Sequence, residues 1–89
     1  MKRITVITTK ITSNYSDVDF EALKQKEMPF IKQWNEQGVL ENFFIKSDTN
    51  GAVLIFKGLD MEQVVKNIEN LPFFPYLENV EYLELNKVF

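Results

Sequence analysis

Glu27 is the residue whose type and position best suit it to chemistry. The apolar residues between positions 20 and 34 recur at the spacing of one helix face, formed by Phe20, Leu23, Phe30, Ile31 and Trp34. Glu27 falls in the middle of that face, seven residues after Phe20 and seven before Trp34. Burial of a carboxyl group raises its pKa toward neutrality, where the group can both accept and donate a proton. Glu27 is therefore a candidate general acid/base.

A purely structural role for Glu27 is an alternative that the sequence leaves open. Pro29 removes a helical hydrogen bond, and a kink there would rotate the Glu27 carboxylate toward solvent. The carboxylate would also be stabilised by pairing with a lysine such as Lys46 or Lys57. In either case the pKa of Glu27 would stay near that of an ordinary glutamate.

The composition excludes several classes of chemistry. The chain contains no cysteine and no histidine, which excludes disulfides, thiolate chemistry, histidine-assisted nucleophiles and the usual zinc, haem and iron–sulfur sites. No loop gathers the carboxylates that a calcium or magnesium ion requires. We therefore expect no cofactor and no metal. The net charge is −3 and the basic residues are scattered, so nucleic acid is not an expected partner.

The length of the chain fits one domain, spanning residues 1–89. The N-terminal residues alternate apolar and polar side chains and do not resemble a signal peptide. No apolar run approaches the length of a membrane span, so we expect a cytoplasmic protein without membrane partners.

The elements that must position Glu27 follow a βαββαβ order. We predict strands over residues 3–12, 39–46, 52–57 and 79–85. A first helix, capped by Ser16 or Asp17, should run to about residue 37 and stop at Gly38, with a kink or a break into two pieces at Pro29. A turn over residues 47–51 joins the middle strands, and a second helix begins at Asp60 and ends near residue 70. This order predicts a ferredoxin-like α+β fold, a four-stranded antiparallel sheet backed by two helices.

The strands carry apolar residues on both faces of the predicted sheet. Strict alternation groups Leu40 with Phe44 against Phe43 and Ile45, Leu54 with Phe56 against Val53 and Ile55, Val80 with Tyr82 against Leu83 and Leu85, and Ile4 with Val6 against Ile7 and Ile11. Exposing about six such side chains would forfeit on the order of 10 kcal/mol. That loss is comparable to the net stability of a domain. Because two helices cover only one face, we expect a homodimer; the alternative is a monomer with a few exposed apolar groups.

The segment 71–77, Leu-Pro-Phe-Phe-Pro-Tyr-Leu, is stiffened by two prolines and carries three aromatic rings. It is predicted to be neither a regular helix nor a central strand. We expect it to pack in the core, at a subunit contact or against a pocket. Tyr76 has a polar hydroxyl group and is the residue of this segment most suited to contact a ligand.

The same segment resembles the Leu-Pro-Leu-Phe-Pro-Tyr-Met sequence near the end of muconolactone δ-isomerases. The Leu23-Lys-Gln-Lys-Glu27 sequence is similar to their Leu-Lys-x-x-Glu, Gly38 matches the glycine that ends their first helix, and Val53, Ile55 and Phe56 match their Val-Ser-Ile-Phe strand. The resemblance implies a dimeric α+β barrel that assembles into higher oligomers in the isomerases. It also implies a pocket between helices and sheet, in which a cofactor-free isomerase moves a proton within a lactone, with Glu27 as the acid/base.

Three functional hypotheses follow. In the first, the protein is a cofactor-independent isomerase acting on a small lactone-like or aromatic molecule. Glu27 is then the catalytic residue, Trp34, Phe44 and Phe56 are the walls of the substrate site, and Tyr76 is a donor to the substrate. In the second, the same pocket binds a small apolar ligand without catalysis. In the third, the chain is an oligomerisation domain, and Glu27 lies in solvent beside a filled core.

Overall fold

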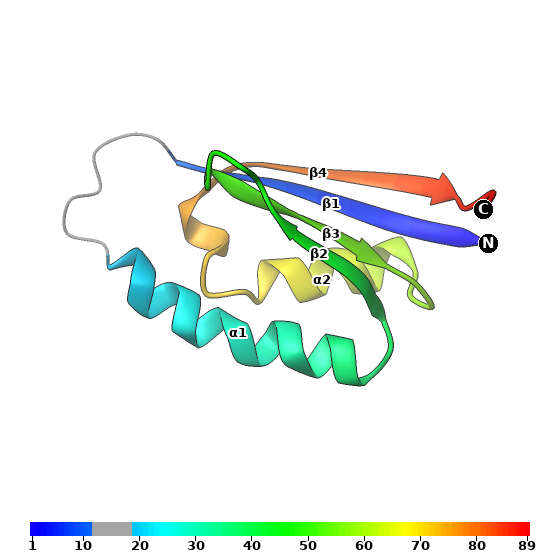
Figure 1. The fold of residues 1–89 in the computed structure, drawn as a ribbon, viewed down its shortest axis with the longest axis horizontal. Coiled ribbons are helices and arrows are strands. Elements are labelled where there is room, and N and C mark those ends of the chain that lie inside the picture. Colours follow the sequence, from blue (N-terminus) through cyan, green and yellow to red (C-terminus); the bar gives the residue numbers. More distant parts are fainter. Residues whose placement is uncertain (12–18) are drawn as a thin grey trace.

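The computed structural model describes residues 1–11 and 19–89. The elements are β1 (Lys2–Lys10), α1 (Phe20–Glu36), β2 (Leu40–Ile45), β3 (Gly51–Phe56), α2 (Met61–Glu69), a short 3₁₀ helix η1 (Phe74–Tyr76) and β4 (Leu77–Asn86). The strands form one antiparallel sheet in the order β2-β3-β1-β4. Both helices lie on the same side of this sheet (Figure 1). The predicted ferredoxin-like α+β fold is therefore confirmed.

Helix α1 begins at an N-cap residue, Asp19, whose Oδ1 accepts a hydrogen bond of 3.1 Å from the Ala22 backbone N–H. The predicted cap residues Ser16 and Asp17 lie outside the described residues. The helix runs without interruption through Pro29, so a break into two helical pieces at that residue was a wrong prediction. It ends where expected, because Gly38 takes a φ of +75°, which favours glycine.

The core lies between the helices and one face of the sheet. Ile31 and Trp34 of α1 are each 6% exposed, and this packing holds the part of the helix that follows the proline against the sheet. Helix α2, which starts with a capping box between Asp60 and Gln63, contributes Val64 and Ile68. The sheet contributes the buried residues Ile4, Val6, Leu40, Leu54 and Phe56.

Strand β2 departs from the predicted alternation. Leu40 pairs with Phe56, but Asn42 already pairs with Ile55, so the register shifts by an irregularity between them. Such a bulge reverses the alternation of side chains that follow it. Leu40 and Phe43 therefore both pack toward the helices, whereas Phe44 faces the other way and is 52% exposed. Grouping Leu40 with Phe44 was wrong.

The sheet face that carries no helix is also apolar, as the sequence indicates. We call this the open face. The alternation of side chains and the strand registers place on it Ile7, Phe44, Val53, Ile55, Leu83 and Leu85. Leu83 and Leu85 are each nearly half exposed. All four strands thus contribute apolar side chains to the open face.

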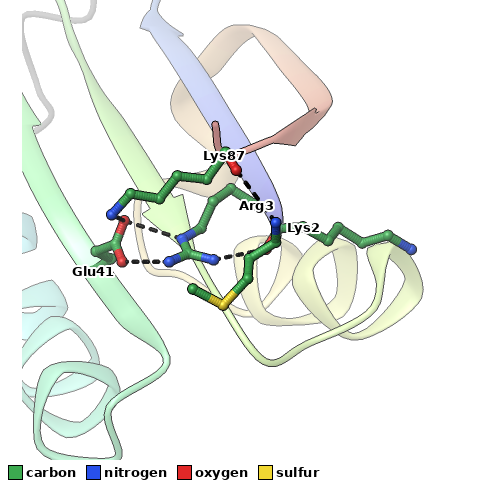
Figure 2. A network of polar contacts seen from close by, with 5 residues as sticks. Lys2, Arg3, Glu41 and Lys87 are labelled. Carbon is green, nitrogen blue, oxygen red and sulfur yellow. Dashed lines mark hydrogen bonds and ion pairs between the residues drawn. The ribbon is translucent and has the colours of Figure 1, made fainter. Parts of the chain in front are cut away.

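An ion-pair network crosses one end of the open face (Figure 2). Arg3 Nε donates to Glu41 Oε1 at 3.1 Å, and Arg3 Nη2 donates to Glu41 Oε2 at 2.9 Å. Arg3 Nη1 donates to the Lys2 carbonyl oxygen at 3.1 Å, and Lys87 Nζ lies 3.9 Å from Glu41 Oε1. The hydrogen bonds from Arg3 lower the pKa of Glu41 below its usual value. Because Arg3 lies in β1 and Glu41 in β2, the pair bridges the intervening strand β3.

The β2–β3 hairpin depends on Gly51, as the turn prediction implies. Asp48 Oδ1 accepts a hydrogen bond of 2.9 Å from the Asn50 backbone N–H. Thr49, two residues before β3, adopts a left-handed backbone conformation with a φ of 59°. Gly51 has a φ of +147°, and a Cβ atom there would collide with the Thr8 carbonyl oxygen.

We expect Gly51→Ala to destabilise the protein by about 2–3 kcal/mol, because both the backbone conformation and the β1–β3 pairing would have to change. Urea unfolding measures this loss. Gly58→Ala is the matched control, since Gly58 also has a positive φ but nothing lies near its Cβ position. Equal losses in the two variants would contradict the role assigned to the Thr8 contact.

A candidate active site around Glu27

A cavity of about 350 Å³ lies between the first half of α1, the helix-facing side of the sheet and the segment that precedes β4. This volume is in the range of small-molecule sites. Most of its lining is apolar and includes Met28, Ile31, Phe43, Ile45, Leu54, Leu71, Phe73 and Leu77. The polar side chains that reach it are Thr8, Lys10, Lys24, Glu27 and Thr49. The cavity can therefore enclose a small, mostly apolar molecule beside a few polar groups.

Glu27 is the carboxyl group in this lining. Its side chain is half-buried. Among the described residues, this side chain makes no hydrogen bond and no ion pair. Desolvation raises its pKa from 4.5 to about 7. Lys46, one of the partners weighed above, instead donates to Thr9 Oγ1 at 3.1 Å, and Lys57 acts on the pKa of Glu41. Near neutral pH, Glu27 is present in both its protonated and ionised forms.

Two lysines line the cavity together with this carboxyl group. Lys10 and Lys24 both line the cavity, and Lys10 Nζ also lies 5.5 Å from the centre of the Phe20 ring. The sole arginine, Arg3, is bound to Glu41 on the open face. Recognition of an anionic substituent inside the cavity would therefore depend on lysine.

The aromatic segment 71–77 closes one end of the cavity. The Phe73 ring stacks on Phe20 with a centroid separation of 5.9 Å, and Tyr76 meets the same ring edge-on at 6.1 Å. Leu71 is buried, and Phe73 lies in the cavity wall. The segment thus fixes the start of α1 and forms part of the pocket, two of the roles considered for it from the sequence.

The structure brings one of the five sequence-predicted site residues, Glu27, into the cavity lining. Trp34 and Phe56 lie in the core, where their rings meet edge to face at 5.4 Å. Phe44 lies on the open face because of the bulge in β2, so its assignment to the pocket wall is corrected to Phe43. Tyr76 contacts Phe20 beside the cavity and is not among its lining residues.

Sequence reasoning missed several lining residues, including Lys10, Lys24 and Phe43. The two lysines carry no local signal, because each lies at an ordinary surface position of its strand or helix. Of the missed residues, Phe73 had the clearest signal in the sequence, since it belongs to the unusual aromatic segment 71–77. The helix face that identified Glu27 also contains Ile31, which is both a core residue and part of the cavity wall.

The raised pKa of Glu27 predicts a specific pH dependence of stability. A carboxyl group whose folded-state pKa exceeds its unfolded value contributes stability below about pH 4.5 and loses that contribution as the pH rises through about 7. Glu27→Gln removes the loss, so its stability relative to the original protein should increase between pH 4.5 and 8. After discounting for partial solvation of the side chain, we expect a relative gain of about 1–2 kcal/mol.

Urea unfolding of both proteins at the two pH values measures this difference. Glu36→Gln is the control, because Glu36 is an exposed residue of the same helix outside the cavity. A parallel pH dependence for the original protein and Glu27→Gln would exclude a desolvated carboxyl group at position 27.

Within the described residues, no group of three or more acidic, cysteine or histidine side chains is arranged to hold a metal ion. In the same part of the chain, no helix is long and apolar enough to cross a membrane.

The sheet order, the two helices on one side and the pocket between them define the fold as ferredoxin-like, of the type found in muconolactone isomerase-like proteins. No protein-family model and no curated protein sequence matches this chain. Comparison with solved structures, however, finds clear neighbours.

Two of these neighbours superpose on nearly the whole chain. Muconolactone isomerase matches with a TM-score of 0.74 and 19% identity, over 98% of this chain and 90% of the isomerase chain. The 5-chloro-2-hydroxyhydroquinone dehydrochlorinase of Burkholderia phenoliruptrix, solved with 2,5-dihydroxybenzoquinone, matches with a TM-score of 0.75 and 9% identity, over 94% and 93% of the two chains. The resemblance found in the sequence is thus confirmed at the level of the fold.

Proposed function

We propose that this protein is a cofactor-independent isomerase that transfers a proton within a small lactone-like or aromatic molecule, with Glu27 as the acid/base. The observation that carries the proposal is a desolvated carboxyl group, with a pKa of about 7, in the wall of a 350 Å³ apolar cavity. Perturbed carboxyl groups of this kind collect at functional sites. The two structural neighbours are enzymes that act on small molecules, which supports the same class of function.

The proposed reaction needs one group that both removes and returns a proton. The ionised carboxylate of Glu27 takes a proton from a carbon next to a carbonyl group, and the electron pair moves toward the carbonyl oxygen. The resulting carboxylic acid then returns the proton at another carbon of the same molecule, so that no group is gained or lost. A pKa near the working pH suits both steps.

Lys10 and Lys24 supply positive charge at the cavity. In the proposed reaction they stabilise an anionic substituent of the ligand or the charge that develops on its oxygen. A lysine ammonium group acts as a point charge and does not impose the planar, two-pronged geometry of arginine. This arrangement favours a ligand with a single acidic group, such as a carboxylate or a phenolate, on an apolar ring.

A second candidate function is binding without catalysis. It is favoured by the fact that Glu27 has no hydrogen-bonding partner among the described residues that would orient it toward a particular substrate atom. In this case the cavity holds an aromatic or lipid-like ligand, and the protonated carboxyl group serves as a hydrogen-bond donor.

A thermal-shift screen of small lactones, phenols and fatty acids tests whether the cavity takes such ligands. A ligand of the Glu27 cavity should raise the melting temperature of the original protein, and the increase should change in Glu27→Gln but not in Glu36→Gln. Stabilisation by fatty acids alone would favour the binding function. Equal stabilisation of all three proteins by every ligand would place binding outside this cavity and contradict both functions.

We also propose that the open face pairs with a second copy of the chain. The six apolar residues on that face support this, because the helices occupy the opposite side and the structure offers no other cover for them within the described residues (Figure 1). We propose this homodimer as the unit from which any larger assembly is built.

A further inference from the structure

Lys10 is a half-buried cation without an anion. Lys10 and Lys46 are half-buried, whereas the other lysines are exposed. Lys46 Nζ donates to Thr9 Oγ1 at 3.1 Å. Within residues 1–11 and 19–89, Lys10 Nζ makes no hydrogen bond and no ion pair, and it lies 5.5 Å from the centre of the Phe20 ring. Because removing an ammonium group from water is costly unless the charge is paired, the position of Lys10 favours contact with an anion.

The backbone of Lys10 is held on both sides. Its N–H donates to the Asn50 carbonyl oxygen at 3.0 Å, and Lys10 pairs with Leu77 of β4. The register of β1 against β4 shifts between Thr9 and Lys10, an irregularity of the kind that redirects a side chain. Lys10 and Leu77 both line the Glu27 cavity. The lysine side chain therefore starts from a fixed point in the cavity wall.

Phe20 holds the ammonium group of Lys10 beside the aromatic wall of this cavity. The same ring stacks on Phe73, a lining residue, with a centroid separation of 5.9 Å. A cation–π contact with phenylalanine is weaker than a hydrogen bond between an ammonium group and a carboxylate. An anionic ligand in the cavity can therefore draw the ammonium group away from the ring.

Lys10 and Glu27 line one cavity without forming an ion pair. Desolvation raises the pKa of Glu27, and no cation of the described residues acts to lower it. An ammonium group within about 4–6 Å of a carboxylate would lower the pKa of that carboxylate. The two groups thus stand apart in the cavity, and a ligand between them can contact both.

Lys24, the other cation of the lining, is less suited to recognise an anion. It is exposed and lies on α1 about one turn before Glu27. The attraction of an exposed ammonium group for an anion is screened by water and salt, whereas that of a half-buried group is screened less. Most of the anion recognition should therefore come from Lys10.

We propose that Lys10 is the specificity-determining residue of the Glu27 cavity and binds a carboxylate group of the ligand, whose ring fills the apolar space toward Glu27. This role rests on the proposed function only in taking this cavity as the ligand site. A ligand held by Lys10 reaches Glu27 with a carbon that lies at a set distance from its carboxylate. The length of the ligand between these two points then selects the molecules that can react.

Three aromatic acids and their uncharged amides test this role. The acids are benzoate, phenylacetate and 3-phenylpropanoate, which differ in the distance between ring and carboxylate. By calorimetry at pH 7, the original protein should bind at least one acid about tenfold or more tightly than its amide. Lys10→Met keeps an unbranched apolar side chain without the charge, and should lose this preference while still binding the amide. Lys10→Arg should retain the preference.

Two further lysine variants separate a local contact from a general effect of charge. Lys26→Met removes an exposed charge of α1 outside the cavity and should leave the preference for the acid unchanged. Lys24→Met should lower it by no more than about threefold, because the charge it removes is exposed to solvent. Circular dichroism should show that all four variants are folded.

Three results would overturn the role of Lys10. They are an original protein that binds no acid more tightly than its amide, a folded Lys10→Met protein that keeps the preference, and equal losses in Lys10→Met and Lys24→Met. Failure of the proposed function has a different signature, because none of the six probes has to react. A preference for the acid that depends on Lys10, without proton exchange in any ligand, would contradict the isomerase and leave the anion site standing.

Discussion

Glu27→Gln is expected to slow proton transfer to and from the ligand by about 10²- to 10⁴-fold, the usual contribution of a general acid/base. Glutamine keeps the shape and the hydrogen-bonding capacity of the side chain but cannot exchange a proton. The ligand should still enter the cavity, because the apolar walls formed by Phe43, Leu54 and Phe73 are unchanged. The loss should therefore appear mainly in kcat and much less in the dissociation constant of the ligand.

Deuterium uptake from heavy water measures the reaction for any ligand found in the thermal-shift screen. NMR or mass spectrometry of the recovered ligand gives the exchange rate, and fluorescence or calorimetry gives the affinity independently. For removal of a proton by the ionised carboxylate, the rate should increase with pH up to about 7 and then level off. Glu36→Gln should retain both the rate and this profile.

Two outcomes would contradict the assignment. One is a Glu27→Gln protein whose exchange rate stays within about twofold of the original. The other is exchange without an inflection near pH 7, since the acting group would then not be the desolvated carboxyl group. Ligand binding with no exchange in either protein would instead favour the second candidate function.

The position of Glu27 could be predicted because it depends on local periodicity alone. A helix places residues seven positions apart on one face whatever the rest of the fold does, so Phe20, Glu27 and Trp34 were expected to share a side. The proline did not disturb this result. Helix α1 continues through Pro29, and the burial of Ile31 and Trp34 keeps its second half on the sheet.

The position of Phe44 could not be predicted, because it depends on a single irregularity in strand pairing. The bulge between Leu40 and Asn42 reverses which side chains face the helices. Nothing in the local sequence marks a bulge there. The irregularity includes Glu41, whose carboxylate accepts hydrogen bonds from Arg3, 38 positions away in the sequence.

The assignment of aromatic residues to the pocket failed for a different reason. Residue type identifies Trp34 and Phe56 as large apolar side chains, but it does not distinguish a core from the wall of a cavity. Their edge-to-face contact fills the space between α1 and β3. The cavity forms nearer the start of α1, where smaller side chains such as Thr8 and Ala52 line the sheet and leave room.

Leu83→Glu is expected to convert the proposed homodimer into a monomer. Leu83 is 45% exposed on the open face, and the strand register places it opposite Thr5 in the neighbouring strand β1. Loss of one buried leucine at an interface costs roughly 1.5–3 kcal/mol, or about 10- to 100-fold in the dissociation constant. The desolvation of a new carboxylate adds to that cost.

Sedimentation velocity at micromolar concentration gives the mass of each protein directly. Gln25→Glu adds the same charge to an exposed position of α1, away from the sheet, and should remain a dimer. Phe44→Glu, on the opposite edge strand of the open face, should dissociate as Leu83→Glu does. Far-ultraviolet circular dichroism should show that all variants keep their fold, since neither apolar residue belongs to the core between sheet and helices.

The dimer prediction is independent of the predictions about Glu27, because the two surfaces lie on opposite sides of the sheet. Glu27 and its cavity are on the helix side, whereas Leu83 and Phe44 are on the open face. A monomeric Leu83→Glu protein should therefore still bind a ligand of the Glu27 cavity. If the original protein is a monomer at micromolar concentration, its apolar open face is exposed to water, and the argument that hydrophobic burial requires a second copy is wrong.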